Sequence, residues 1–420
     1  MKLTLRQIRV VILLLTFSLF FIGLGYSLGQ RDFEVRLSGL KPEVSLDRRL
    51  PPSKEKVSFS LFWQVWDRLT ANYLGRKNLD QAKMIYGAIS GMVASLGDPY
   101  TVFLPPEENK QTKEDLSGLF EGVGIQLGYK NERLAVIAPL TGMPADLAGV
   151  KAGDYIVKVV DEAKKIDKDT TGLSLPEAVS LIRGPKGTIV KLTFERDGVK
   201  EPFTYSLKRE TIVVKSVELK FIEKSGKKIA DLKLTRFGER TAQEWEAAVE
   251  DLKNESKKGQ LAGVILDLRN NPGGFLNGSV FIASEFLSSG VVVQQDKGAD
   301  GKETFSVNRT GTLLNEPLVV LINQGSASAS EIVAGTLQER KRARLVGEKS
   351  FGKGTIQEAQ DLSEGAGLHI TIARWLLPSG KSIDKEGIKP DFEVIRQPAE
   401  DEKDQTSDPQ MEKAIELLTK

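Results

Sequence analysis

A serine-rich corner is the strongest candidate for a nucleophile. Residues 323–331 read Asn-Gln-Gly-Ser-Ala-Ser-Ala-Ser-Glu; they follow an apolar strand that ends at Ile322 and they open a helix. A strand-to-helix corner built from small residues exposes a side chain at the edge of the sheet and leaves backbone N–H groups free. A serine in this run is therefore a candidate nucleophile, with the next amide as an oxyanion donor. Helix capping, a frequent role of serine, is the alternative interpretation.

A lysine between two glycines, Lys353, is the candidate base. The chain has no cysteine and one histidine, His369, which excludes thiolate chemistry, disulfides, cysteine-ligated zinc and a histidine metal cage. A lysine buried in a dry pocket loses its proton and can accept the proton of a serine. A solvated loop lysine is the alternative. The segment 352–355 also suggests a phosphate-binding loop, but the full spacing of that motif is missing.

Two glycine motifs are candidates for backbone donors. Gly273 and Gly274 follow a buried strand, and one of their amides can be the second oxyanion donor. A second glycine loop precedes the first strand of a β-rich region, where inward amides can capture a peptide carboxylate and the strand edge can pair with a peptide. This loop consists of Gly122, Val123, Gly124 and Ile125. Ordinary turns are the alternative for both motifs.

The elements around these motifs fall into successive regions. Apolar residues at helical spacing predict helices over 57–112, and short strands with glycine turns predict a mostly β domain at 113–209. Strands and helices alternate over 210–396, which is typical of an α/β layer architecture. The charged, proline-containing stretch 31–56 is predicted to be a linker, and 397–420 a polar tail that ends in a short amphipathic helix.

The N-terminus carries a membrane signal. Residues 10–28 are largely apolar, and Lys2, Arg6 and Arg9 precede them. About 20 apolar residues span a bilayer as a helix, and basic residues on the short N-terminal side keep that end in the cytoplasm. We therefore expect residues 1–30 to anchor the chain in the inner membrane, with the folded body on the extracytoplasmic, periplasmic side. A cleaved signal peptide and a secreted body are the alternative.

These segments together resemble the carboxyl-terminal processing peptidases, the tail-specific protease family, from about residue 59 to residue 418. Besides the serine run and the lysine, the resemblance rests on residues 86–88, 98–101, 144–154, 182–188 and 387–391. It implies an α/β multidomain protein with a crotonase/ClpP-like catalytic core, an inserted PDZ-like domain and N-terminal helices.

The resemblance also implies roles for individual residues. Ser328, the middle serine of its run, is the nucleophile, and Lys353, 25 positions later, is the base. The amides of Ala329 and Gly274 form the oxyanion hole. Gln357 orients the lysine; because four residues of extended strand cover about 13 Å, its contact with Lys353 requires a bend.

The implied activity is that of a serine endopeptidase that cleaves near protein C-termini. A PDZ-like domain catches substrates with apolar tails at residues 122–125, Arg183 is a candidate gate, and neither metal nor cofactor is needed. His369 is expected to be structural. Helices near 59–69 and 411–418 can form a homodimer or pack within one chain, and an adaptor protein is compatible with the family.

Two other classes stay open, namely a PDZ-containing scaffold with an inactive core and an acyl-CoA enzyme on a crotonase-like fold. Intact Ser328 and Lys353 argue against the first, and the membrane signal and PDZ-like region argue against the second. The near balance of 59 Lys plus Arg against 57 Asp plus Glu gives no electrostatic reason to expect nucleic acid as a partner.

Overall fold

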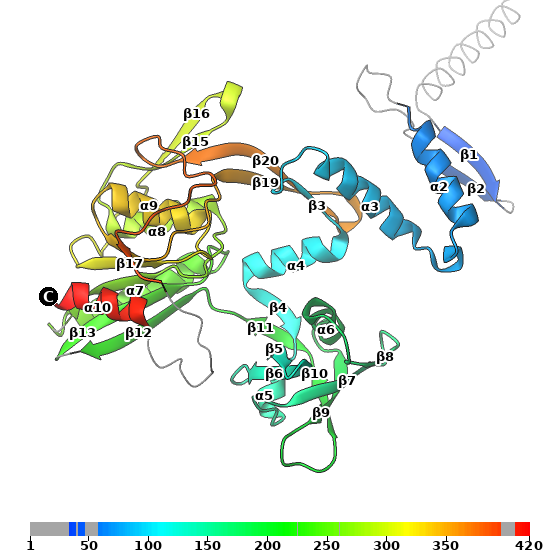
Figure 1. The fold of residues 1–420 in the computed structure, drawn as a ribbon, viewed down its shortest axis with the longest axis horizontal. Coiled ribbons are helices and arrows are strands. Elements are labelled where there is room, and N and C mark those ends of the chain that lie inside the picture. The colour runs from blue at the N-terminus through cyan, green and yellow to red at the C-terminus, as the bar shows by residue number, and fades with distance from the viewer. Residues whose placement is uncertain (1–32, 39–40, 47–57, 225, 260, 396–407) are drawn as a thin grey trace, which may run out of the picture. The chain divides into compact units, whose positions relative to one another are not determined.

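The computed structural model describes residues 33–38, 41–46, 58–224, 226–259, 261–395 and 408–420 (Figure 1). The predicted membrane anchor lies outside these residues, and none of the helices within them is long and apolar enough to cross a bilayer. The range predicted as a linker contains an antiparallel hairpin of β1 (Phe33–Ser38) and β2 (Lys41–Leu46). Apolar residues alternate with charged ones there, which is a strand pattern that the nearby prolines obscured.

The two helices predicted at the N-terminal side are confirmed as α2 (Ser60–Asn72) and α3 (Gln81–Ala94). Residues 1–85 and 86–420 form separate compact units. In the second unit, the chain passes from α3 through β3 (Val102–Leu104) to α4 (Pro106–Ser117). Tyr86 packs on Phe103 with ring centroids 6.0 Å apart, so α3 is fixed to the strand that follows it.

A mostly β module follows, as predicted. Its sheet has the order β10–β9–β7–β6–β5, with β8 beside β7, and its own core of buried aliphatic side chains. The strands are β5 (Ile125–Lys130), β6 (Arg133–Pro139), β7 (Tyr155–Asp161), β8 (Ile166–Asp169), β9 (Ile189–Glu195) and β10 (Phe203–Lys208), and the helices are α5 (Pro144–Leu147) and α6 (Leu175–Ile182). Ser174 is the N-cap of α6, as expected. Strands β4 (Leu119–Gly122) and β11 (Glu210–Val213) pair where the chain enters and leaves the module.

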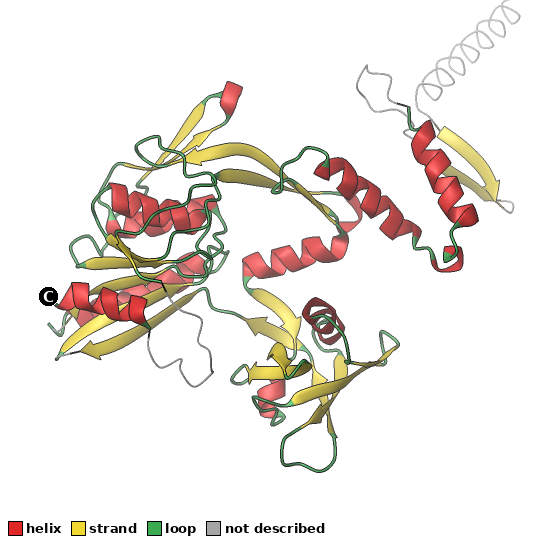
Figure 2. Ribbon diagram, viewed as in Figure 1, coloured by secondary structure: helices red, strands yellow, loops and turns green. Residues whose placement is uncertain are grey.

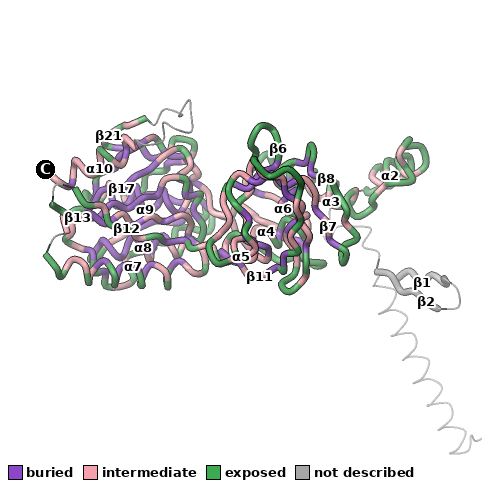
Figure 3. Tube along the Cα trace, turned by 90° about the horizontal axis from the view of Figure 1, so that it is seen from below, coloured by how far each residue is buried: buried purple, intermediate pink, exposed green. Residues whose placement is uncertain are grey.

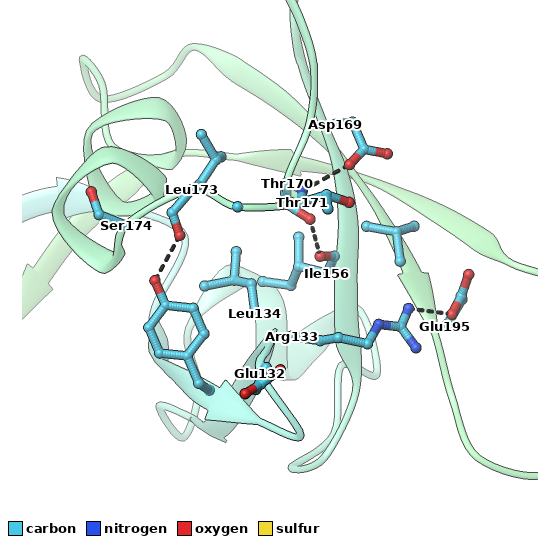
Figure 4. Close-up of a pocket in the computed structure, with 13 residues that line it drawn as sticks. Glu132, Arg133, Leu134, Ile156, Asp169, Thr170, Thr171, Leu173, Ser174 and Glu195 are labelled. Atoms are coloured by element: carbon cyan, nitrogen blue, oxygen red, sulfur yellow. Dashed lines mark hydrogen bonds and ion pairs between the residues drawn. The ribbon is translucent and has the colours of Figure 1, made fainter.

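The module contains a cavity of about 550 Å³ near the N-terminal end of α6 (Figure 4). Its lining includes the buried side chains of Leu134, Ile156 and Leu173. The hydroxyl of Tyr129, on β5, donates a hydrogen bond to the carbonyl of Leu173 at 2.6 Å. This bond fastens the end of the edge strand to the segment that leads into α6.

The large sheet of the second unit has the order β12–β13–β14–β17–β18–β21, in which β12 is antiparallel to β13 and the remaining strands are parallel. Strands, in yellow, and helices, in red, lie in layers in this part of the chain (Figure 2). The strands are β12 (Val217–Lys224), β13 (Lys227–Leu234), β14 (Leu261–Asp267), β17 (Leu318–Ile322), β18 (Arg344–Gly347) and β21 (Phe392–Glu393). The helices are α7 (Thr241–Ser256), α8 (Leu276–Phe286), α9 (Ala329–Glu339) and α10 (Pro409–Thr419).

The strand residues alternate between two buried faces of this sheet. Figure 3 shows buried residues in purple along its central strands. Ala230 and Leu266 belong to the large core that includes apolar side chains of α7, α8 and α9, whereas Ile229 and Ile265 belong to a smaller core with α10. Burial on both faces explains the continuous Val-Ile-Leu runs of the central strands. The predicted alternation of strands and helices is therefore confirmed as a mixed α/β architecture.

A second, antiparallel sheet was mostly not predicted. Its order is β16–β15–β20–β19, and β3 pairs with β20. Its strands are β15 (Val291–Asp296), β16 (Lys302–Ser306), β19 (Thr355–Asp361) and β20 (Gly367–Leu376). Only β15 was expected, because β19 is polar and largely exposed and lacks an apolar face that a sequence pattern would reveal. The pairing of β3 with β20 brings residues near position 100 alongside those near 370.

Candidate functional site

Three neighbouring parallel strands deliver the predicted catalytic residues to one edge of the large sheet. Strand β14 leads into the Gly273–Gly274 loop, β17 into the serine corner and β18 into the loop that carries Lys353. Because β14, β17 and β18 are adjacent and parallel, their carboxyl ends meet at the same edge. The alternation of strands and helices therefore brings together three segments that are distant in sequence.

Ser328 has an unusual backbone conformation at the start of α9. Its φ of 55° and ψ of −117° lie outside the regions that non-glycine residues usually adopt. The hydroxyls of its neighbours are engaged, since Ser326 Oγ donates to the carbonyl of Leu268 and Ser330 Oγ donates to that of Asn271, each at 2.8 Å. These bonds tie the serine corner to the loop after β14. Strained backbone of this kind is often found at functional sites.

The Gly273–Gly274 loop lies against the serine corner. A Cβ atom on Gly273, whose φ is +98°, would come within 2.8 Å of Ser328 Cβ and 2.9 Å of the amide nitrogen of Ala329, so only glycine fits. The Gly273 amide donates to Asn271 Oδ1 at 2.9 Å. Within the described part of the chain, no hydrogen bond uses the amides of Ala329 or Gly274. The structure thus leaves both predicted oxyanion donors available beside the serine.

Lys353 lies where two glycines allow close backbone packing. A Cβ atom on Gly352 would meet the amide nitrogen of Gly387 at 2.9 Å, and one on Gly354 would meet Asp384 Cβ at 2.5 Å. The indole of Trp375 donates to the Lys353 carbonyl at 2.7 Å. Burial lowers the pKa of Lys353, while the charges of Glu331 and Asp98 act in the opposite direction. A lowered pKa is what a lysine base requires.

Glu331, which sequence reasoning did not single out, links the serine and lysine segments. Its fully buried carboxylate accepts hydrogen bonds from the amides of Ser328 (2.8 Å) and Lys353 (3.0 Å) on the same oxygen, Oε2. The other oxygen accepts from Ser350 Oγ at 2.6 Å and the amide of Gly352 at 2.7 Å. Burial raises its pKa, and these four donors oppose that shift. One signal was present in the sequence: a glutamate at the N3 position after a serine N-cap.

The side chains of the predicted triad are not joined by hydrogen bonds within the described residues. Gln357 Nε2 donates to Thr355 Oγ1 at 2.9 Å and to Thr371 Oγ1 at 3.1 Å rather than contacting Lys353. The required bend is present as a register irregularity between Ile356 and Gln357. The structure brings Ser328 and Lys353 together through their backbones and places Gln357 in the neighbouring strand. His369 lies on β20 opposite Val102, and burial, then the charge of Lys353, lowers its pKa.

The predicted tail-binding residues lie at the edge strand of the β module. Gly124 has a φ of +74°, and a Cβ atom there would come within 2.3 Å of Met143 Cβ. The carbonyls of Val123 and Gly124 accept from the amides of Ala145 (3.0 Å) and Leu140 (2.9 Å). These contacts fix the loop, and β5 follows it as the edge of its sheet. A strand added to that edge would run beside the loop.

A charged cluster adjoins the glycine loop at the end of β14. Arg269 pairs with Asp267 at 2.7 Å and with Asp408, the N-cap of α10, at 2.8 Å. Asp231 lies on the neighbouring strand, and its Oδ1 is buried with no hydrogen-bond partner among the described residues. Burial, and then the charge of Asp267, raises the pKa of Asp231 to about 6.

The raised pKa of Asp231 predicts a stability that falls as the pH rises. Between the ordinary value of 3.8 and about 6, the folded chain binds a proton that the unfolded chain releases. We expect the free energy of unfolding to drop by up to about 3 kcal/mol across this window and Asp231→Asn to flatten the profile. Urea unfolding followed by tryptophan fluorescence at several pH values measures it, with exposed Asp251→Asn as the control. Identical profiles for Asp231→Asn and the wild type would contradict the assignment.

Comparison with known proteins identifies the family of the chain. The family model for peptidase family S41 matches residues 228–394, and the model for the activating protease CtpB N-terminal domain matches residues 41–108. The chain is 37% identical over 327 residues to carboxy-terminal processing protease CtpA of Bacillus subtilis, covering 78% of this chain and 67% of that protein. It is 38% identical over 361 residues to the carboxyl-terminal-processing protease of Synechocystis, covering 85% of this chain and 82% of that protein.

A solved structure shares the fold. The chain is similar to a Bacteroides fragilis protein assigned to the S41 proteases, with a TM-score of 0.50 and 17% identity, over 83% of this chain and 92% of that one. The sequence identity to the two proteases named above extends over most of the chain and is the stronger evidence for its family. The chain belongs to the carboxy-terminal processing proteases of peptidase family S41, which are serine-type peptidases.

Proposed function

We propose that the chain is an endopeptidase that recognises protein C-termini through a PDZ domain and cleaves near them with a Ser–Lys site. The observation that carries this proposal is the carboxylate of Glu331, because one of its oxygens accepts from the amides of both Ser328 and Lys353. Two residues 25 positions apart in the sequence are thereby held beside a pair of unengaged amides.

In the proposed reaction, Ser328 Oγ attacks the carbonyl carbon of the scissile peptide while neutral Lys353 Nζ accepts the serine proton. The carbonyl electron pair moves to the oxygen, and the amides of Ala329 and Gly274 donate to the oxyanion. Each such donor is typically worth about 10²–10³ in rate. Protonated Lys353 then gives the proton to the leaving amine as the C–N bond breaks. Water then attacks the acyl-enzyme while Lys353 accepts its proton, and Lys353 returns that proton to Ser328 Oγ as the ester bond breaks.

Tail recognition is proposed for the β module, which we assign to the PDZ class. The amides near Gly122–Ile125 would receive the terminal carboxylate, and the open edge of β5 would pair with the tail. Leu127, on β5, and Leu175, on α6, are partly buried against the core of the module, so apolar tail residues would find apolar surface there. These features support protein substrates with apolar C-termini.

Arg183 is positioned to couple the tail site to the rest of the second unit. It is the C-cap of α6, its guanidinium lies 4.4 Å from the ring centroid of Phe120, and it pairs with Glu114 of α4 at 3.2 Å. Its Cγ atom is also near the position that a Cβ on Gly122 would take. A tail bound at this loop would therefore disturb Arg183, which supports its role as a gate.

The core fold, the location and the partners of the chain are proposed from its sequence and from the layers of its sheet. The layered parallel sheet supports a crotonase/ClpP-like core, and the apolar segment 10–28 supports a location outside the cytoplasm at the inner membrane. Several large apolar side chains of α2, including Trp63 and Leu69, are exposed in the chain and would suit a homodimer. The adaptor stays a prediction from the resemblance.

Cleavage of paired substrates tests the proposal. The free carboxylate of an apolar tail should make charged hydrogen bonds that a C-terminal amide cannot make, so the amidated substrate should be cleaved with a kcat/KM about 10–100-fold lower. Mass spectrometry of the products from the full chain locates the cut and gives the rates, and Ser328→Ala is the blank. Equal rates for the free and amidated tails would count against tail recognition, and products from Ser328→Ala would count against the Ser–Lys site.

A further inference from the structure

Residues 98–101 lie at the catalytic site although they precede the β module in the chain. They connect α3 to β3, and β3 pairs with β20, with Val102 opposite His369. Lys353 Nζ lies 5.1 Å from the ring centroid of Tyr100. The side chain proposed as the base is therefore covered by a residue from outside the segment that matches peptidase family S41.

Hydrogen bonds hold this segment in place. The Tyr100 amide donates to Asp98 Oδ1 at 3.0 Å, and Thr101 Oγ1 donates to Asp98 Oδ2 at 2.7 Å. The Thr371 amide donates to Thr101 Oγ1 at 3.0 Å, and Thr371 Oγ1 accepts from Gln357. The predicted lysine-orienting glutamine thus belongs to the polar chain that positions Tyr100.

The ring of Tyr100 lies beside the amine of Lys353, which has few other partners in the described part of the chain. Within the described residues no hydrogen bond uses Lys353 Nζ. The charged groups that act on it are Glu331 from α9 and Asp98 from the 98–101 segment. Burial, then the charge of Lys353, lowers the pKa of His369 on β20, and burial, then the charge of Asp384, raises the pKa of Tyr100. An ammonium over an aromatic face is attracted by the ring quadrupole, more strongly when it is desolvated.

We propose that Tyr100 is a positioning residue whose ring face holds Lys353 and stabilises the ammonium formed when Ser328 Oγ transfers its proton. This inference rests on the proposed Ser–Lys reaction. The proton passes from Ser328 to Lys353 and later to the leaving amine, and the ring takes part only by attracting the charged form. The consequence is that the S41-matching segment alone lacks part of its catalytic environment.

The test compares Tyr100→Leu, which removes the ring, with Tyr100→Phe, which keeps it. We expect Tyr100→Phe to stay within about twofold of wild type and Tyr100→Leu to lose about 3–30-fold in the kcat/KM plateau. Loss of the cation–π attraction also lowers the pKa of Lys353, so the acid limb of the pH–rate profile should move down by about 0.5–1 unit for Tyr100→Leu. A structural role alone would not shift that limb.

A ring-fluorination series at position 100 removes the dependence on folding of the leucine variant. Successive fluorines on a phenylalanine ring, which has no phenol to ionise, weaken the negative ring face with little change in shape, so log kcat/KM should fall steadily with fluorine number. An unchanged rate across the series, or an acid limb shared by the leucine and phenylalanine variants, would overturn the inference. Ser328→Ala and Lys353→Met, measured in parallel, separate a failure of the Ser–Lys reaction from a failure of the Tyr100 inference. If these two variants keep their activity, the proposed reaction is wrong. If they are inactive, the Tyr100 variants test the role of Tyr100 alone.

Discussion

Replacing Lys353 with methionine is expected to reduce peptide cleavage by about 10⁴-fold or more, because it removes the base while it keeps the length and apolar stem of the side chain. Ser328→Ala should cause a loss of similar size, and the double variant should be little worse than either, because the two residues act as one unit. Wild-type activity should rise with pH as Lys353 loses its proton, with a midpoint below the usual range of lysine, since burial lowers its pKa.

Steady-state kinetics over a range of pH on the full chain measures this effect. Lys349→Met is the matched control, because Lys349 is exposed in the same loop and should leave the rate unchanged. A Lys353→Met variant with near-normal rates would exclude lysine as the base. A wild-type protein that is as inert as the variants on substrates with free apolar tails would favour the inactive scaffold.

Glu331→Ala is expected to lower kcat by about 100-fold, because displacing a catalytic group by about 1 Å costs that much. It leaves four donors unsatisfied, those of Ser328, Ser350, Gly352 and Lys353. Leaving buried donors without partners should also reduce the free energy of unfolding by about 2–4 kcal/mol. Glu331→Gln should lie between wild type and alanine, since its single carbonyl oxygen can serve only one of the two donor pairs.

Rates and unfolding midpoints measured on the same preparations separate a catalytic effect from simple loss of folded protein. Glu339→Ala is the control on the same helix, because its carboxylate binds Ser379 rather than the site. Glu339→Ala should lose some stability and keep its kcat. The assignment would be wrong if Glu331→Ala folded and turned over substrate at the wild-type rate.

The elements that bury an apolar face could be predicted from sequence. The strands that became β14 and β17 have Val-Ile-Leu runs, and the alternation of β and α segments predicted the α/β layers, in which the structure shows a parallel sheet. The serine corner was predicted because it follows one of these strands and opens a helix, and Lys353 because two glycines flank it and the chain has no cysteine and one histidine. Residues at the carboxyl ends of adjacent parallel strands meet whatever their separation in sequence.

The contacts that sequence spacing did not predict depend on partners far away in the chain. Tyr100 reaches Lys353 through the pairing of β3 with β20. The alternation of Leu368, Ile370 and Ile372 is typical of a strand, but it does not specify this distant partner. Gln357 was expected to contact Lys353, but its partners include Thr371 on the paired strand. Glu331 resembled an ordinary helix-capping residue, and only the fold shows that its carboxylate also binds the lysine loop.

The double attachment of Glu331 has a consequence for damaged or incompletely folded copies of the enzyme. Local opening of residues 350–354 breaks the bonds to this carboxylate and carries the amine away, while the serine stays on its helix. In the proposed Ser–Lys reaction, such a copy would keep its nucleophile and lose its base. We therefore expect opening of this segment to abolish proteolytic activity without global unfolding, so that a copy damaged there would not degrade the proteins around it.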